Sequence, residues 1–550
     1  MWSAEYSPSV MMSNNKAFPV YNSQHNAVGA WFLGPRAENF DYMKRFLHDV
    51  INEQKKAREE YYPTDEASDS RLSFLIDVNF ITSTMQSSSA FQENMRNLDK
   101  WLKVLNEMLA KYSVPFWSPR YNARMIMDTS LPGNLAYIAT MLYNPNNVSS
   151  MLSPWTTLVE IEVGKQLCAM LGFNTDPKNK EKPVAWGHIT SGGSVANLES
   201  VWYVFQMLMN YAVYPLMQIY LRNAIGKTAP LSYIADTFNV ELCTGQEKLF
   251  KDLSAWELLN LKPSTVLSIP QRLFDEYGIS AEYLHSVTHA YSIHTVGKDT
   301  LEKQFDIVNP TQYLIGTTKH YSWPKAAGET ITGIGSNNVI DVPVDNAARM
   351  DISELDRLLA ERLKNQQAVY AVVVIMGSTE QGAVDPLDKV VELRKEYERR
   401  GLTFVIHADA AWGGYFASML CLPLPVGDKD ANPDPDNEFV PTLALQPYTE
   451  TQIRHYGFCD SITIDPHKSG YIPYPAGGLC YRDERMRYLV TWKSPLVYTS
   501  DEEENIGVYG IEGSKPGAAP AAIWLSHSVI GLHKYGYGGL LGEATFTCTK

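Results

Sequence analysis

The stretch AVYAVVVIMGS, residues 368–378, is nearly continuous in valine and other apolar side chains. It is followed by PLDKVVELRKEYERRG (386–401) and by TFVIHADA (403–410). Unbroken apolar runs are typical of strands buried on both faces. The segment between them has the spaced apolar residues of a helix that stops at Gly401. The order strand, helix, strand predicts a parallel sheet with right-handed crossovers.

Two further runs, VAWGHIT (184–190) and SITID (461–465), extend the same pattern. In an open sheet of this kind, ligands bind beyond the carboxyl ends of the strands. Those ends carry SGGS (191–194), GSTEQG (377–382) and DPHKSG (465–470). We therefore expect an α/β fold, with a mostly parallel central sheet flanked by helices and a functional site along one sheet edge.

The rest of the chain is organised around this core. Two amphipathic stretches, 38–62 and 91–113, predict helices that precede the first strand. We divide the chain into four parts: a flexible tail (1–30), an N-terminal helical segment (31–116), a large domain (117–500) and a connection toward a C-terminal domain (501–550).

Composition excludes several classes of protein. The 550 residues carry a formal net charge of -14, which argues against binding to nucleic acid or to an anionic membrane. The six cysteines form no C-x-x-C pair, as expected of reduced thiols in a cytosolic protein. The uncharged stretch 201–221 is long enough to span a bilayer, but its Gln, Asn and Tyr residues favour a buried or interface helix.

The turn at Gly192, Gly193 and Ser194 joins a predicted strand to a predicted helix. Glycines allow close backbone approach, and a helix N-terminus presents unpaired N–H groups to an anion. The turn is therefore a candidate phosphate cradle, although an ordinary N-cap turn has the same composition. No G-K-[ST] follows it, so it is not a Walker loop.

Three other residues are unusual for their expected surroundings. Asp409 ends an apolar strand, where a carboxylate is costly unless it is paired, although it could simply cap a turn. Lys468 follows another strand, and we expect desolvation to lower its pKa and make it a nucleophile. His320 could offer a flat imidazole face or be an ordinary core histidine. An amine, a carboxylate, a flat ring and a phosphate cradle are what pyridoxal 5'-phosphate (PLP) needs.

Five motifs carry a resemblance to a known family: HADAAWGGY (407–415), SITIDPHKSGYIPYPAGG (461–478), TKHYSWPKAAG (318–328), MGSTEQGAVD (376–385) and EGSKPGAAPAAIW (512–524). In combination they resemble the group II PLP-dependent amino-acid decarboxylases of fold type I, and the tyrosine decarboxylases of bacteria above all. The likeness extends over most of the chain.

The resemblance implies a role for each matching residue. Lys468 would form the Schiff base with PLP, Asp409 would hold the pyridine nitrogen protonated, and His320 and Ala411 would lie against the two ring faces. The residues expected at the phosphate or elsewhere on the cofactor are Gly193, Ser194, Thr379 and His467, with Gly513 and Ser514 reaching the phosphate from a neighbouring subunit. The N-terminal helices would then serve dimerisation.

The implied reaction is decarboxylation of an aromatic L-amino acid, with tyrosine, phenylalanine, tryptophan and dopa left open. The family protonates Cα with a tyrosine from a mobile loop, but here Leu496 stands at that position and Tyr498 lies two residues later. Tyr498 is therefore the candidate proton donor. An aromatic aldehyde synthase is the nearest alternative, since loss of that tyrosine favours oxidative deamination, and a non-catalytic dimeric relative is the second. The family also continues into a small C-terminal domain, and we expect the chain to be truncated at Lys550 relative to it.

Two weaker patterns complete the predictions. Aromatic residues at Phe116, Trp117, Tyr121 and Trp155 lie in segments that line the pocket in relatives, although such residues are usually core. The segment 428–439 alternates acidic residues as a calcium loop does. Calcium binding is nevertheless disfavoured, because a proline replaces the glycine of the turn and a phenylalanine replaces the closing glutamate.

Overall fold

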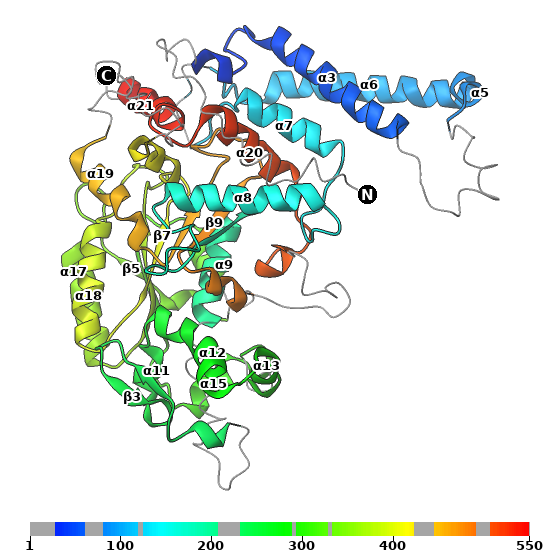
Figure 1. Cartoon of the computed structure of the whole chain (residues 1–550). Coiled ribbons are helices and arrows are strands. Elements are labelled where there is room, and N and C mark those ends of the chain that lie inside the picture. Colours follow the sequence, from blue (N-terminus) through cyan, green and yellow to red (C-terminus); the bar gives the residue numbers. More distant parts are fainter. Residues whose placement is uncertain are drawn as a thin grey trace, which may run out of the picture. The chain divides into compact units, whose positions relative to one another are not determined.

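The computed structural model of the chain is drawn in Figure 1. It describes residues 28–60, 81–118, 121, 125–206, 231–288, 293–327, 333–422, 445–490 and 506–548. The chain divides into two compact units. The smaller unit is Leu33–Ala123, and the larger consists of Met1–Phe32 together with Arg124–Lys550.

The smaller unit is helical where it is described. Its helices are α3 (Phe40–Glu59), α5 (Ser83–Ser87) and α6 (Ser89–Tyr112), and α3 and α6 confirm the two predicted amphipathic stretches. The Ser88 hydroxyl accepts a hydrogen bond from the backbone of Phe91 and caps α6. None of the three helices has a buried residue, so their apolar side chains are left on the surface.

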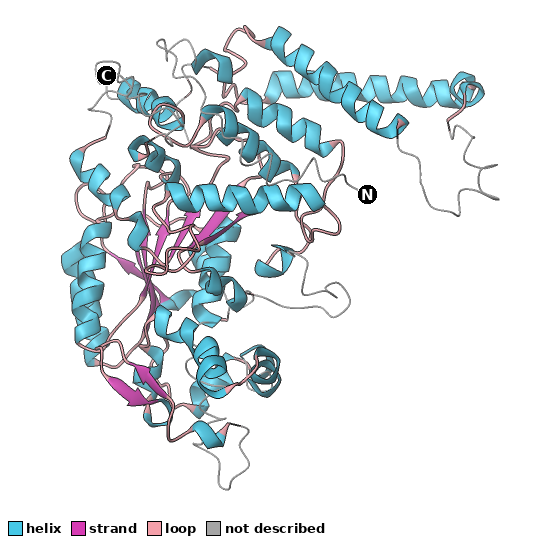
Figure 2. Ribbon diagram, viewed as in Figure 1, coloured by secondary structure: helices cyan, strands magenta, loops and turns pink. Residues whose placement is uncertain are grey.

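The larger unit is built on a seven-stranded sheet (Figure 2). In spatial order its strands are β1 (Trp186–Thr190), β9 (Gly477–Tyr481), β8 (Ser461–Ile464), β7 (Val405–Asp409), β6 (Val369–Ile375), β4 (Gln312–Gly316) and β5 (Val339–Val342). Strands β8, β7, β6, β4 and β5 pair in parallel, whereas β9 is antiparallel to both of its neighbours. The predicted α/β fold with a mostly parallel sheet is confirmed.

Both faces of the sheet are buried, which explains the unbroken apolar runs. Along β6, Ala371 and Val373 join one hydrophobic core while Val372 and Val374 join the other. Side chains of a strand alternate between its faces, so a strand covered on both sides needs apolar residues at every position. All seven residues of β6 are accordingly buried.

Helices cover the two faces. The first core includes residues of α9 (Gly193–Gln206), α12 (Pro263–Tyr277) and α16 (Ser322–Ala326). The second includes residues of α8 (Pro154–Met170), α17 (Ile352–Lys364), α18 (Leu387–Arg399) and α20 (Ala518–Ile530). The shorter or peripheral helices of the described chain are α7 (Leu131–Met141), α11 (Ala255–Leu259), α13 (Ala281–Thr288), α14 (Ile293–Val296), α15 (Lys298–Gln304), α19 (Pro447–Arg454) and α21 (Tyr537–Cys548).

The predicted crossover between β6 and β7 is helix α18. It ends at Arg399, and Gly401 follows with a φ of +91°, a left-handed conformation that favours glycine. Leu387, Val390 and Val391 of α18 are buried in the second core. The strand, helix, strand prediction made from residues 368–410 is therefore confirmed.

Three strands of the sheet were not among the clearest sequence candidates. Strand β4 begins with glutamine and ends with glycine, β5 is only partly buried, and β9 begins with two glycines, which have low strand propensity. A separate two-stranded hairpin joins β2 (Asn239–Glu241) to β3 (Glu247–Leu249). These strands depend on pairing with neighbours more than on their own composition.

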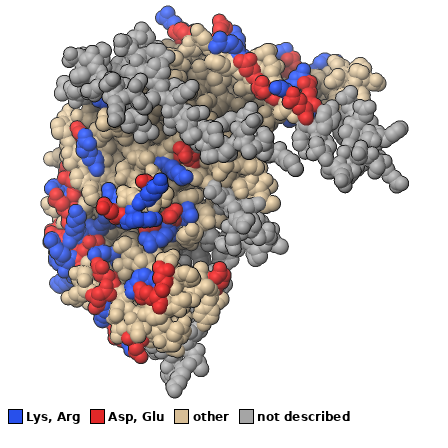
Figure 3. Space-filling view, in the orientation of Figure 1, with Lys and Arg blue, Asp and Glu red and all other residues tan. Residues whose placement is uncertain are grey.

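Acidic and basic side chains alternate over the face drawn in Figure 3, without a large field of one sign. In the part of the chain that the structure describes, no helix is both long and apolar enough to cross a membrane. Of the uncharged stretch 201–221, only the first residues, at the end of α9, are described.

Candidate functional site

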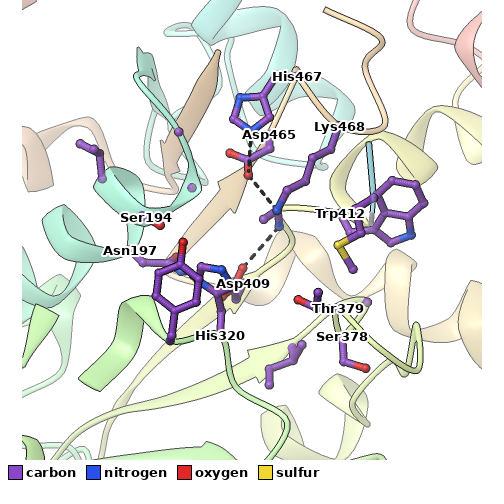
Figure 4. A pocket seen from close by; sticks show the side chains of 18 of the residues that line it. Ser194, Asn197, His320, Ser378, Thr379, Asp409, Trp412, Asp465, His467 and Lys468 are labelled. Carbon is purple, nitrogen blue, oxygen red and sulfur yellow. Dashed lines mark hydrogen bonds and ion pairs between the residues drawn. The ribbon is translucent and has the colours of Figure 1, made fainter. Parts of the chain in front are cut away.

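A cavity of about 330 Å³ opens at the carboxyl ends of β1, β6, β7 and β8 (Figure 4). Pockets for small ligands are commonly of this order. Eight of the candidate residues line it: Gly193, Ser194, His320, Thr379, Asp409, Ala411, His467 and Lys468. The fold thus gathers side chains that are up to 275 positions apart, from Gly193 to Lys468, at one sheet edge.

Lys468 lies in the turn that follows β8, and its ammonium nitrogen is 3.1 Å from the Asp465 carboxylate. The expectation of a lowered pKa is wrong. Burial does act to lower the pKa of Lys468, but the negative charges of Asp465 and Asp409 outweigh it, and the pKa is raised. The lysine is therefore held as an ammonium until a reactant changes its surroundings.

Asp409 ends β7 and is buried, with 6% of its surface exposed. Its Oδ2 accepts two hydrogen bonds, one from the Trp323 indole and one from the Asn197 side chain, each 2.9 Å long. Its Oδ1 is 3.5 Å from the backbone nitrogen of Ala411. The carboxylate is thus fixed by neutral donors on one side.

His320 is partly buried, and burial lowers the pKa of its imidazole. Its Nδ1 accepts a hydrogen bond from the backbone nitrogen of Ser322 at 3.2 Å and lies 2.9 Å from the Ser322 hydroxyl. A nitrogen that accepts carries no proton, so the neutral ring has its hydrogen on Nε2. A neutral, oriented imidazole is suited to stack on another flat ring.

The turn before α9 is closely packed around its glycines. A Cβ added at Gly193 would lie 2.7 Å from a carboxylate oxygen of Asp465, and one at Gly192 would lie 3.3 Å from the His467 ring. Gly193 is the first residue of α9, so the N-terminal N–H groups of that helix face this region. Ser194 is exposed beside it. The geometry agrees with an anion cradle.

His467 is buried between this turn and the lysine. Its Nδ1 accepts a hydrogen bond from the backbone of Ala476 at 3.1 Å, and its Nε2 lies 3.5 Å from Asp465. Burial lowers the pKa of His467, which favours the neutral ring. The ring centroid is 4.1 Å from that of Tyr474.

Asp465 was missed as a site residue, although it stands in the quoted motif 461–478. Its side chain is buried, and its Oδ1 has no hydrogen-bond partner among the described residues. A buried acidic residue directly after an apolar strand was the available signal. Asn197, Trp412 and Tyr474 also line the cavity without having been predicted.

Several predicted residues lie elsewhere. Gly513 and Ser514 do not line the cavity of their own chain; Ser514 accepts a hydrogen bond from Asn146 instead. Trp155 packs edge-to-face on Trp524, at 5.6 Å between ring centroids, and does not line the cavity. Tyr498, Leu496 and the acidic segment 428–439 are outside the described residues. Phe116, Trp117 and Tyr121 belong to the smaller unit.

The arrangement fits PLP on its own geometry. The Lys468 amine, the buried Asp409 carboxylate, the neutral His320 imidazole and a glycine turn at a helix N-terminus meet in a single cavity. The described residues contain no group of three or more His, Cys, Asp or Glu side chains that could hold a metal ion. An organic cofactor is therefore better matched to this cavity than a metal centre is.

Comparison with known proteins points the same way. Residues 292–423 match the model of the pyridoxal-dependent decarboxylase conserved domain. L-tyrosine decarboxylase of Enterococcus faecalis is 33% identical over 94% of this chain and 74% of its own length. L-tyrosine decarboxylase of Levilactobacillus brevis is 32% identical over 94% of this chain and 73% of its own. Among solved structures, mouse CSAD is 16% identical, with a TM-score of 0.49, over 90% of this chain and 75% of that one.

Proposed function

The chain belongs to the family of pyridoxal-dependent decarboxylases that includes the bacterial L-tyrosine decarboxylases, and from this premise we propose that it decarboxylates an aromatic L-amino acid, tyrosine foremost. The products are the arylalkylamine and carbon dioxide. The observation that carries the proposal is the placement of Lys468 and Asp409 in one cavity, at the ends of the paired strands β8 and β7.

Each of these residues has a defined task. The Lys468 amine would bind the aldehyde of PLP, and the Asp409 carboxylate would hold a proton on the ring nitrogen. His320 would lie against the ring, while Gly193 and Ser194 would bind the phosphate through the start of α9. When bound, the cofactor supplies the electron sink for the pair left behind by the departing carboxylate.

An aromatic substrate suits the cavity mouth. Tyr321 and Tyr474 line the cavity and are 61% and 51% exposed, and Trp412 lines it as well. Rings that line a pocket and are still open to solvent can stack on an incoming ring. The named activity of the two bacterial relatives favours tyrosine among the aromatic amino acids. Tyr498 remains our candidate for the proton donor to Cα.

The test is product analysis with the full chain. Purified protein loaded with PLP is incubated with tyrosine, phenylalanine, tryptophan and dopa, and products are identified by mass spectrometry. We expect the amine and carbon dioxide, with tyramine formed fastest. Aldehyde with ammonia and peroxide would favour the aldehyde synthase instead. A chain that gains no visible absorbance from added PLP would be a non-catalytic relative.

We further propose that the chain acts as a homodimer in the cytoplasm, with Gly513 and Ser514 serving the partner's cavity. The apolar face of α6 supports the dimer, because Trp101 and Leu105 are 65% and 53% exposed. An exposed apolar stripe of this kind is typical of an interface. Five of the six cysteines, Cys168, Cys243, Cys421, Cys459 and Cys480, are free thiols, as expected in a reducing compartment.

Sedimentation velocity tests the dimer. We expect the wild-type chain to sediment at twice the mass of one chain, and the Trp101→Glu/Leu105→Glu variant at the mass of one chain. Val308→Glu, at a position 87% exposed in the larger unit, is the matched control and should leave the dimer intact. A monomeric wild-type chain that is fully active would contradict the shared site.

A further inference from the structure

We propose that Trp323 and Asn197 are positioning residues, which hold the Asp409 carboxylate in place and turn its Oδ1 toward the ring nitrogen of the cofactor. The inference rests on the proposed function and goes beyond it by naming the groups that orient the Asp409 carboxylate. Both residues donate to the same oxygen, Oδ2, at 2.9 Å. The other oxygen, Oδ1, has only a long contact of 3.5 Å from the backbone nitrogen of Ala411, so it can still accept from the ring.

Burial makes this support necessary. Asp409 is 6% exposed, Asn197 is 2% exposed and Trp323 is 1% exposed, so water contributes little at this end of the cavity. An ionised carboxylate in such surroundings is costly unless hydrogen bonds stabilise the charge. An indole N–H and an amide N–H supply those bonds without introducing a positive charge that would compete for Oδ1.

The orientation of Asn197 is set by a third residue. The Thr463 hydroxyl donates to Asn197 Oδ1 at 2.8 Å, so the amide nitrogen must face Asp409. The reverse orientation would place the amide oxygen against the carboxylate. With its only proton given to Asn197, the Thr463 hydroxyl can accept from His407 Nε2, 3.2 Å away, when the neutral ring carries its hydrogen on that nitrogen. His407 Nδ1, on the other side of the ring, lies 2.7 Å from the Ser461 hydroxyl.

The same network reaches the stacking residue. Asn197 Nδ2 also donates to the Ser322 hydroxyl at 3.0 Å, and that hydroxyl lies 2.9 Å from His320 Nδ1. Ser322 and Trp323 are the first two residues of α16, so one short helix contacts both Asp409 and His320. One hydrogen-bond network therefore orients both Asp409, expected at the ring nitrogen, and His320, expected to stack on the ring.

The test measures how tightly the chain binds two cofactors and does not depend on its activity. PLP and its 1-deaza analogue, which has carbon in place of the ring nitrogen, are bound to the wild-type chain, and the dissociation constants give a preference ratio. The wild-type chain should prefer PLP by about tenfold or more, because the analogue cannot form the hydrogen bond between the ring nitrogen and the charged Asp409 carboxylate. Trp323→Phe and Asn197→Leu should reduce that ratio severalfold, toward the ratio of Asp409→Asn.

A merely structural role would weaken the binding of both cofactors equally and leave the ratio unchanged, which would overturn the inference. To separate the N–H from the ring, Trp323 is also replaced by its benzothienyl isostere, in which sulfur stands for N–H. This variant keeps the packing and should still lose preference. Tyr313→Phe is the control: it removes a buried hydroxyl that donates to Val201 and should keep the wild-type ratio. A wild-type chain that binds neither cofactor would instead contradict the proposed function.

Discussion

Lys468 is partly buried and Lys515 is buried; each pairs with a buried carboxylate, yet their surroundings differ. Lys468 faces Asp465 in a cavity of about 330 Å³, and its side chain is 20% exposed. Lys515 pairs with Glu160, its side chain is 7% exposed, and the cavity beside the pair is about 10 Å³. That is room for about one water molecule.

The carboxylates differ as well. Glu160 accepts from Lys515, from the Asn147 side chain at 2.8 Å and from the backbone of Ile189 at 3.0 Å, so both of its oxygens are used. Asp465 keeps one oxygen without a hydrogen-bond partner among the described residues. A buried lysine alone therefore does not mark a reactive site. We infer a reactive site where the lysine faces an open cavity and its carboxylate partner keeps an oxygen without a hydrogen bond.

The largest effect should come from removing the reactive amine. Lys468→Ala should abolish decarboxylation, because no other lysine lines the cavity among the residues that the structure describes. Borohydride reduction of the PLP-loaded wild-type chain should place the cofactor on the peptide that contains Lys468 and leave the Lys515 peptide unlabelled. Activity in the Lys468→Ala chain, or label on Lys515, would reverse our assignment of the two lysines.

The buried ion pair of Lys515 and Glu160 should matter for stability rather than for activity. Lys515→Met leaves the Glu160 charge buried without its cation, which should cost about 3 to 5 kcal/mol of folding free energy. Urea unfolding followed by tryptophan fluorescence measures the loss. Lys389→Met, at a half-exposed lysine on the surface of α18, is the matched control and should leave the unfolding midpoint in place. Equal unfolding midpoints for the two variants would show that the pair of Lys515 and Glu160 does not stabilise the fold.

Low pH should destabilise the fold through His407, a member of the hydrogen-bond network that leads to Asp409. Burial lowers the pKa of His407 to about 4, whereas an unfolded histidine titrates near 6.5. Between these values the unfolded chain binds a proton that the folded chain does not, so stability falls as pH falls. The loss amounts to roughly 3 kcal/mol and ends near pH 4. Thermal unfolding at pH 7, 6, 5 and 4 measures it, and His407→Gln should show a shallower dependence.

The smallest effect should be a shift in the pKa of Lys468. Asp465→Asn removes the nearest negative charge, so the effect of burial is offset less and the pKa of the lysine should fall, although Asp409 still raises it. The pH midpoint for capture of PLP, followed by its visible absorbance, should move down. Glu512→Gln is the control, since Glu512 bonds Ser191 at the rim of the cavity and not the lysine. An unmoved midpoint in Asp465→Asn would mean that another charge sets the titration.

Local pattern made much of this molecule predictable. The apolar runs that became β6, β7 and β8, the helix between the first two, and the glycine turn before α9 are all visible in short windows of sequence. Lys468 and Asp409 stood out because charged residues are rare at the ends of such strands. Periodicity and composition act over a few residues, so one sequence is enough to detect them.

Other features depend on distances between residues far apart in the chain. The antiparallel insertion of β9, the raised pKa of Lys468 and the donation of Trp323 and Asn197 to Asp409 follow from strand order and helix packing. Coulomb energies and hydrogen bonds vary steeply with separation. Residues 86 and 212 positions away from Asp409 in the sequence acquire those separations only when the sheet is assembled. The sequence therefore singled out the candidate groups, whereas their surroundings and orientations were set by the tertiary fold.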